Sequence, residues 1–174
     1  SMPASRRTVL LAELSPMAIL ETTQAWAGES PLLAGPVDLV REGVLAGRTK
    51  VMFAAPGEKF ALGWGPETSI RVQREVTRLD EKTRMLSSWI KVPHRVRLKL
   101  SNLGSDPVTL DVTERLPVSE LREVEIEVDR EATTGGASPD DDGFVRWTVT
   151  VPPHGRDVIA LDWTLSKKDD VKGI

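Results

Sequence analysis

The stretch His94-Arg95-Val96-Arg97-Leu98-Lys99-Leu100 alternates apolar and basic side chains with a period of two. Successive side chains of a β-strand point to opposite faces, so the three apolar residues predict the buried face of a half-buried strand. The opposite face carries three cations, which we call the basic row: Arg95, Arg97 and Lys99.

The same alternation continues along the chain. The segment from Asn102 to Pro107 has turn chemistry and Val108–Thr113 alternates again, so the two runs predict a hairpin. Farther on, Val124–Val128 alternates with an acidic row: Glu123, Glu125, Glu127 and Asp129. Opposite charges on neighbouring strands attract, so we expect Asp111 beside Arg97 and the acidic row one or two strands away. The alternatives are that each row binds a partner, or that both are solvated faces.

The remaining chain also favours strands. They are expected at Val9–Leu14, Ala18–Trp26, Val37–Arg41, Thr49–Phe53, Phe60–Gly63, Ile70–Leu79, Met85–Val92, Phe144–Val151 and Arg156–Leu165. No stretch has a convincing helical period, so the fold class is all-β, an antiparallel β-sandwich or open barrel of about ten strands. Residues 1–7 suggest a cloning remnant and a flexible N-terminus, and 8–174 a single β-rich domain with a subdivision left open near 80–93. The 133–143 loop offers nothing to a core, so shortening it should be tolerated.

Composition excludes several classes of protein. The 174 residues carry 23 Lys+Arg and 26 Asp+Glu, a net charge of -3 that argues against nucleic-acid binding. The absence of cysteine excludes disulfides, a thiolate metal site and a cysteine nucleophile. No segment is long and apolar enough to predict a membrane span. The lack of a visible export signal favours a cytoplasmic location, and a signal peptide in a longer parent protein would place the domain in the cell envelope.

Two strings resemble a known family. The first runs from Val112 to Glu120 and contains Glu-Arg-Leu-Pro-Val-Ser-Glu after an Asn102–Val108 turn; the second runs from Asp142 to Trp147. Together with the Gly63-Trp64-Gly65 stretch, they resemble the C-terminal domain of bacterial mucoidy inhibitor A-like proteins, domain of unknown function 4139. The resemblance implies a β-rich module of a larger bacterial protein, and it transfers no reaction.

Each candidate site has a plain structural alternative. Glu114 and Glu120 could act as acid and base and Arg115 could hold an anion, or the stretch could simply end a strand at Pro117. Trp26 and Trp64 could stack on sugar rings; Trp147 and Trp163 share the parity of apolar neighbours and belong in the core.

The other polar motifs favour structural roles. Asp140-Asp141-Asp142 lacks the alternating spacing of a calcium loop, and His94 and His154 without a nearby cysteine or spaced acidic motif favour surface turns over zinc. We therefore expect no metal and no cofactor.

The expected function is a non-enzymatic interaction or structural β-domain that makes contacts through strand faces and edges. Its partner would be another protein or a second copy, and the candidate contact residues are Arg95, Arg97, Lys99, Glu114, Arg115, Glu125, Trp26 and Trp64. The alternatives are a polysaccharide-binding domain that uses exposed tryptophan and an acid/base hydrolase that uses Glu114 and Glu120.

Overall fold

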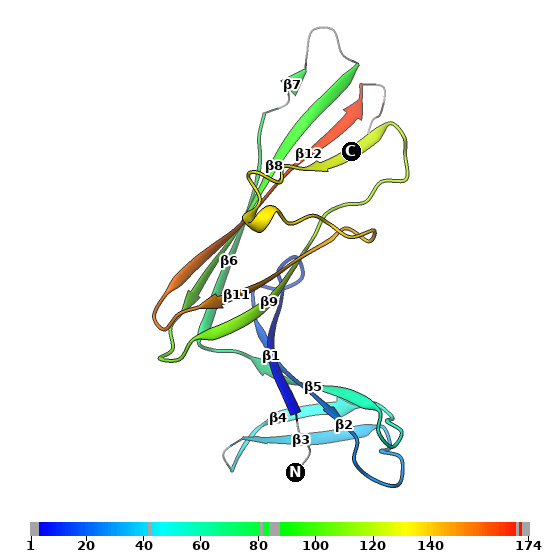
Figure 1. The fold of residues 1–174 in the computed structure, drawn as a ribbon, viewed down its shortest axis with the longest axis vertical. Helices are drawn as coiled ribbons and strands as arrows, with labels where there is room; N and C mark the ends of the chain where they lie inside the picture. The colour runs from blue at the N-terminus through cyan, green and yellow to red at the C-terminus, as the bar shows by residue number, and fades with distance from the viewer. Residues whose placement is uncertain (1–3, 42, 81, 84–87, 170, 172–174) are drawn as a thin grey trace.

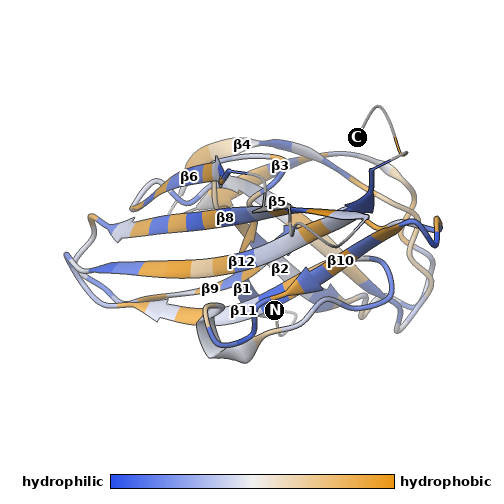
Figure 2. Cartoon of the chain, turned by 90° about the horizontal axis from the view of Figure 1, so that it is seen from above, coloured by the Kyte–Doolittle hydropathy of each residue, from blue (hydrophilic) through white to orange (hydrophobic). Residues whose placement is uncertain are grey.

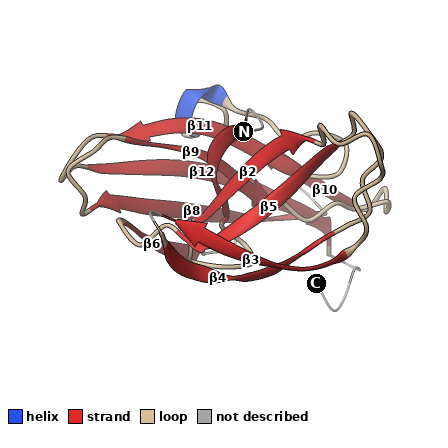
Figure 3. Cartoon of the chain, turned by 90° about the horizontal axis from the view of Figure 1, so that it is seen from below, coloured by secondary structure: helices blue, strands red, loops and turns tan. Residues whose placement is uncertain are grey.

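The computed structural model describes residues 4–41, 43–80, 82–83, 88–169 and 171. Strands dominate them, and one short 3-10 helix, η1 (Thr134–Gly136), lies near β11 (Figures 1 and 3). The strands are β1 (Ala4–Leu11), β2 (Ile19–Ala25), β3 (Gly35–Arg41), β4 (Val44–Val51), β5 (Lys59–Pro66), β6 (Ile70–Arg78), β7 (Lys82–Thr83), β8 (Trp89–Asn102), β9 (Val108–Arg115), β10 (Val124–Val128), β11 (Phe144–Val151) and β12 (Arg156–Lys168).

Two main sheets face each other. One has the order β11-β9-β1-β2-β5 and the other the order β10-β12-β8-β6, with β7 beside β8. Neighbouring strands are antiparallel, except that β1 and β9 are parallel. The core lies between the sheets, where Leu10, Leu98, Leu110 and Ile159 are fully buried. The described strands close no barrel, so the prediction of an all-β sandwich is confirmed.

The predicted hairpin between the runs at 94–100 and 108–113 is wrong. β8 pairs with β12 and β6, whereas β9 pairs with β11 and β1, so the intervening loop crosses from one sheet to the other. The amide of buried Asn102 fixes this crossing: its Nδ2 donates to the carbonyls of Asp106 at 2.7 Å and Val151 at 3.1 Å, and its Oδ1 accepts from the Gly104 N–H at 2.9 Å. The residues between β8 and β9 do form a turn, but it connects strands of two different sheets.

The predicted faces of β8 are confirmed. Val96, Leu98 and Leu100 are buried, and hydrophobic and hydrophilic residues alternate along the strand (Figure 2). β8 and β12 pair over nearly their whole length, and at one end they form a second, smaller core with β10: Val92, Val124 and Leu165.

A two-stranded ribbon, which we call the arm (residues 35–51), lies outside the main sheets. It consists of β3 and β4 and is inserted between β2 and β5. In Figure 1 it lies beside β5 and the end of β2, at the opposite end of the molecule from β7. The arm buries Leu39 and Val51. A bulge between Leu39 and Val40 interrupts the register near its tip.

Several other strand boundaries differ from the expectation. β1 begins at Ala4, inside the segment assigned to the N-terminus, and pairs with β2 from that residue. The second arm strand runs over Val44–Val51, earlier than the expected Thr49–Phe53. Of the expected strand Met85–Val92, residues 85–87 lie outside the described part of the chain, and β8 begins at Trp89.

The expectation that the 133–143 loop offers nothing to a core is also wrong. Thr133 is buried, and its Oγ1 accepts from the Asp162 N–H at 3.2 Å. The Oγ1 of Thr134 accepts from the Ala160 N–H at 2.8 Å. These hydroxyls satisfy backbone groups of β12 beyond the end of β10, so the loop completes the sheet edge.

Candidate functional site

The basic row is neutralised within its own sheet. Arg95 Nε lies 3.1 Å from Asp162 Oδ2, and Arg97 pairs with the other oxygen of the same carboxylate. Lys99 Nζ contacts Glu75 Oε1 at 2.6 Å. The hydrogen bond to Asp162 raises the pKa of Arg97. The basic row therefore joins β8 to β12 and β6, and Asp111 does not lie beside Arg97 as expected, because it belongs to the opposite sheet.

Glu125 and Glu127 of the acidic row lie on β10, Glu123 and Asp129 directly flank that strand, and β12 lies between β10 and the basic row. A double-mutant cycle should therefore give a coupling above about 1 kcal/mol for Arg97 and Asp162 and below about 0.5 kcal/mol for Arg97 and Glu125. The measurement is chemical denaturation of alanine variants, singly and in pairs. Equal coupling in both cycles would contradict the assigned pairing.

Glu114 forms an ion pair between the sheets. It lies on β9, is 1% exposed, and accepts from Arg74 of β6 through two bonds of 2.8 and 2.9 Å. That hydrogen bonding raises the pKa of Arg74. Glu120 is exposed, beyond the end of β9. Both Glu114 oxygens are thus engaged by a guanidinium, which favours the structural alternative over an acid/base role.

Arg115 points to the outer surface beside Phe144. Its guanidinium carbon lies 5.3 Å from the centre of the Phe144 ring, as does that of Arg146. Both contacts are within the range of a cation–π interaction. Arg146 also bonds to Asp140 Oδ2 at 2.6 Å.

Asp140 organises the turn before β11. Its Oδ1 accepts from the N–H groups of Asp142 and Phe144, and the Arg146 guanidinium is the main cause of its lowered pKa. Among the residues that the structure describes, no three His, Cys, Asp or Glu side chains gather where they could hold a metal.

The two histidines have different settings. His154 lies in the turn after β11, as expected, with a φ of 53°. His94 is not in a turn: it lies within β8 and stacks on Trp163 at a centroid distance of 4.0 Å. Burial lowers the pKa of His94. The expectation of a turn was wrong because Pro93 is accommodated inside the strand.

The tryptophans divide into two groups. Trp147 is buried as expected and donates to the Thr134 carbonyl, while Trp163 is half-buried and contacts both cores. Trp26 and Trp64 are half-buried. Trp26 lies against Gly28 and donates to the Ser30 carbonyl at 2.7 Å, whereas Trp64 donates to Thr22 Oγ1 at 2.8 Å.

Trp64 lines a recess between the arm and the β2–β5 pair. The recess has a volume of about 370 Å³, and its walls are mainly apolar. Five of its apolar lining residues, which we call the recess residues, are Leu32, Val37, Phe60, Leu62 and Trp64. The described residues do not fill the space between the arm and the β2–β5 pair, so this apolar surface is not close-packed as a protein core normally is.

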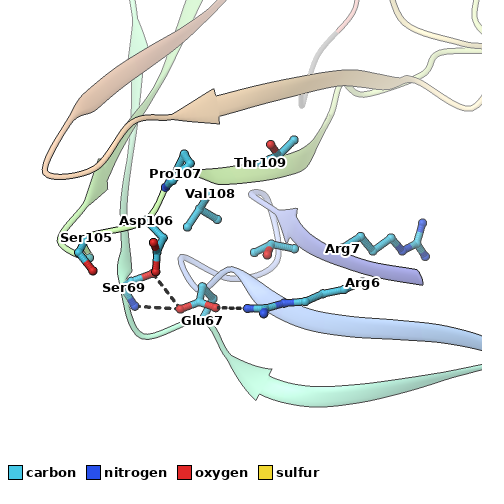
Figure 4. Close-up of a pocket in the computed structure, with 11 residues that line it drawn as sticks. Arg6, Arg7, Glu67, Ser69, Ser105, Asp106, Pro107, Val108 and Thr109 are labelled. Carbon is cyan, nitrogen blue, oxygen red and sulfur yellow. Dashed lines mark hydrogen bonds and ion pairs between the residues drawn. The ribbon is translucent and has the colours of Figure 1, made fainter. Parts of the chain in front are cut away.

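A larger and more polar cleft of about 580 Å³ separates β1 from the β8–β9 loop (Figure 4). Glu67 occupies it and accepts from Ser69 through both its N–H and its hydroxyl, while the opposite carboxylate oxygen contacts Arg6 at 3.4 Å. Asp106 lines the facing loop. Glu67, Ser69 and Arg6 thus satisfy one another, so the cleft is a weaker candidate than the recess.

Comparison with known families decides the affiliation. A family model described as "Domain of unknown function (DUF4139)" matches residues 3–167. The chain belongs to the DUF4139 family. No curated protein and no solved structure matches it. No helix among the described residues of this DUF4139 domain is long and apolar enough to cross a membrane.

The two strings that suggested DUF4139 meet in space. The Leu116 N–H donates to the Gly143 carbonyl at 2.8 Å. Gly143 has a φ of +82°, and a Cβ there would lie 2.5 Å from the Leu116 carbonyl oxygen. Only glycine fits this left-handed, close-packed position. The Asp-Gly turn and the Glu-Arg-Leu-Pro stretch thus form one structural junction in the DUF4139 fold.

The sequence did not single out the recess residues of this DUF4139 domain. Val37 and Leu62 have the alternating pattern of ordinary core positions, Leu32 lies outside any strand expected from the sequence, and nothing local shows that the space between these residues is unfilled. Trp64, flanked by two glycines, was the one signal that pointed to this surface.

Proposed function

We propose that this DUF4139 domain is a non-enzymatic interaction module that self-associates through its arm. The observation that carries this proposal is the exposure of large apolar side chains on and around the arm: Leu33, Val40, Val44, Leu45, Met52 and Phe53 are each between 55 and 76% exposed. Large apolar patches on a protein surface commonly mark interaction sites.

The arm also has open edges. Among the described residues, β3 and β4 pair only with each other. A two-stranded ribbon is marginally stable on its own, and unpaired strand edges are ready to pair with another chain. Contacts made by strand edges and faces are the mode expected from the sequence.

The partner that fits this surface is a second copy of the chain, because each copy has both an apolar tip on its arm and an apolar recess that can receive such a tip. The tip of the arm presents Val44 and Leu45, and the recess offers apolar walls that the described residues leave unfilled. Residues 35–51 contain three basic and two acidic side chains, and Asp38 and Arg48 pair with each other at 2.6 Å. Two nearly neutral arms can therefore approach without strong repulsion.

Sedimentation equilibrium tests this proposal. We expect the wild-type chain of 19.1 kDa to associate as its concentration rises toward about 1 mM, a range that detects even weak contacts. Leu45→Asp should remain monomeric, because a charge at the tip would be desolvated in the contact. The matched control is Val158→Asp on β12, whose residue is 50% exposed but lies far from the arm in the chain; it should associate like the wild type.

A wild-type chain that stays monomeric over the whole concentration range would contradict self-association through the arm. An equal loss of association in Leu45→Asp and Val158→Asp would also contradict it. Saturable binding of a soluble polysaccharide, abolished by Trp64→Ala, would instead support the polysaccharide alternative at the same recess.

A further inference from the structure

A hollow on the outer face of the second sheet follows from the sizes of side chains in neighbouring strands. Ser166 is a small residue of β12, and it is opposite Glu125 of β10 and Lys91 of β8. These long side chains, with Glu127 and Trp89, form the walls of a hollow of about 270 Å³ whose floor includes Ser166.

The Ser166 hydroxyl is the unusual feature of this hollow. Ser166 is 2% exposed, and its Oγ has no hydrogen-bond partner among the described residues. Ser166 lies on the same side of β12 as Asp162, whose carboxylate meets the outward-facing Arg95 and Arg97, so the hydroxyl points toward the hollow. Buried polar groups are nearly always satisfied, and an unsatisfied hydroxyl costs free energy.

The charges around the hydroxyl restrict what could bind there. Lys91 opposes a metal cation, and the carboxylates of Glu125 and Glu127 oppose an anion. A neutral ligand rich in hydroxyl groups can donate to the two carboxylates, accept from Lys91 and bond to Ser166. The indole of Trp89 adds an apolar wall for the C–H face of a ring.

We propose that this hollow binds one ring of a neutral saccharide. Its volume is slightly below that of drug-sized pockets, which fits a single sugar residue. Lys91 and Glu125 are exposed, and the ligand reaches the shielded hydroxyl when these side chains turn outward. The site is independent of the arm and of the recess.

The test is a titration followed by the amide NMR signals of the whole chain, with methyl glucoside and N-acetylglucosamine as separate probes. We expect saturable shifts at Lys91, Glu125 and Ser166. Ser166→Ala and Glu125→Gln should each weaken binding about tenfold, the effect of about 1.4 kcal/mol. The matched controls are Ser101→Ala and Glu120→Gln, which leave the hollow intact and should bind like the wild type.

A second measurement separates a binding role from a structural one. Removing an unpartnered hydroxyl should leave the denaturation midpoint of Ser166→Ala unchanged or raise it. A lowered midpoint would show that the hydroxyl has a structural partner, which would overturn the proposal. The absence of saturable shifts with both sugars, a response to calcium chloride alone, or unchanged affinity in Ser166→Ala would also overturn it.

Discussion

Replacing Arg74 by methionine is expected to lower the free energy of unfolding by about 3–5 kcal/mol, the usual cost of removing one partner from a buried ion pair. The substitution leaves the Glu114 carboxylate, which is 1% exposed, without its guanidinium. Glu114→Gln should cost less, because the Arg74 side chain is 29% exposed and can reach water. Chemical denaturation at neutral pH measures both effects.

The control for this prediction is an exposed ion pair between an arginine and a carboxylate. Arg48 contacts Asp38 at 2.6 Å, but their side chains are 71% and 51% exposed. Arg48→Met should therefore change the stability by no more than about 1 kcal/mol. The double variant Arg74→Met with Glu114→Leu should recover most of the loss, since an apolar pair can replace a buried ion pair. If the double variant lost as much stability as Arg74→Met alone, the loss could not come from an uncompensated Glu114 carboxylate.

Shortening the 133–143 loop to a two-residue Asp-Gly turn should cost more than about 3 kcal/mol, because buried hydrogen bonds are lost and their partners stay unsatisfied. The hydrogen bonds that the shortened loop would lose include those that join Thr133 and Thr134 to β12. They also include the bond of 2.9 Å from Trp147 Nε1 to the Thr134 carbonyl. Thermal or chemical unfolding of the shortened chain measures the loss.

Single substitutions locate that effect within the loop. Thr133→Val keeps the shape of the side chain but removes the acceptor for the Asp162 N–H, and should cost about 1–3 kcal/mol. Thr109→Val is the matched control: its hydroxyl bonds only to that of Thr150 on the exposed face of the other sheet, and the change should stay within about 0.5 kcal/mol. Equal stability of the two valine variants would mean that the loop does not complete the sheet edge.

The sequence predicted the strands and their faces better than their partners. Alternation at Val96, Leu98 and Leu100 fixes which side of β8 is buried, since a shift of one residue would expose all three. It does not specify the neighbouring strand. The hairpin was predicted from the turn residues at 102–107 and the alternation on both sides of them, but the Asn102 hydrogen bonds direct the loop to the opposite sheet.

The roles of single polar residues were harder to predict, because they depend on distant parts of the chain. Glu114 stood out in its stretch, but its partner Arg74 is forty residues away on the other sheet. Thr133 belongs to a loop of small and acidic residues, and its role cannot be seen locally. Because β10 ends at Val128, the Asp162 N–H of β12 has no strand beside it on the β10 side and donates to the Thr133 hydroxyl instead. The exposed arm tip at Val44 and Leu45 has the composition of a core strand.

The most direct test of self-association through the arm uses the fact that the chain has no cysteine. A single Val44→Cys variant can carry a photoactivated crosslinker at the arm tip. Mixing chains with ordinary and heavy nitrogen isotopes then distinguishes crosslinks between copies from those within one copy. The account predicts mixed-isotope peptides that join residue 44 to the recess near Val37, Leu62 or Trp64. Crosslinks confined to single chains, or mixed crosslinks to the outer face around Val158, would contradict it.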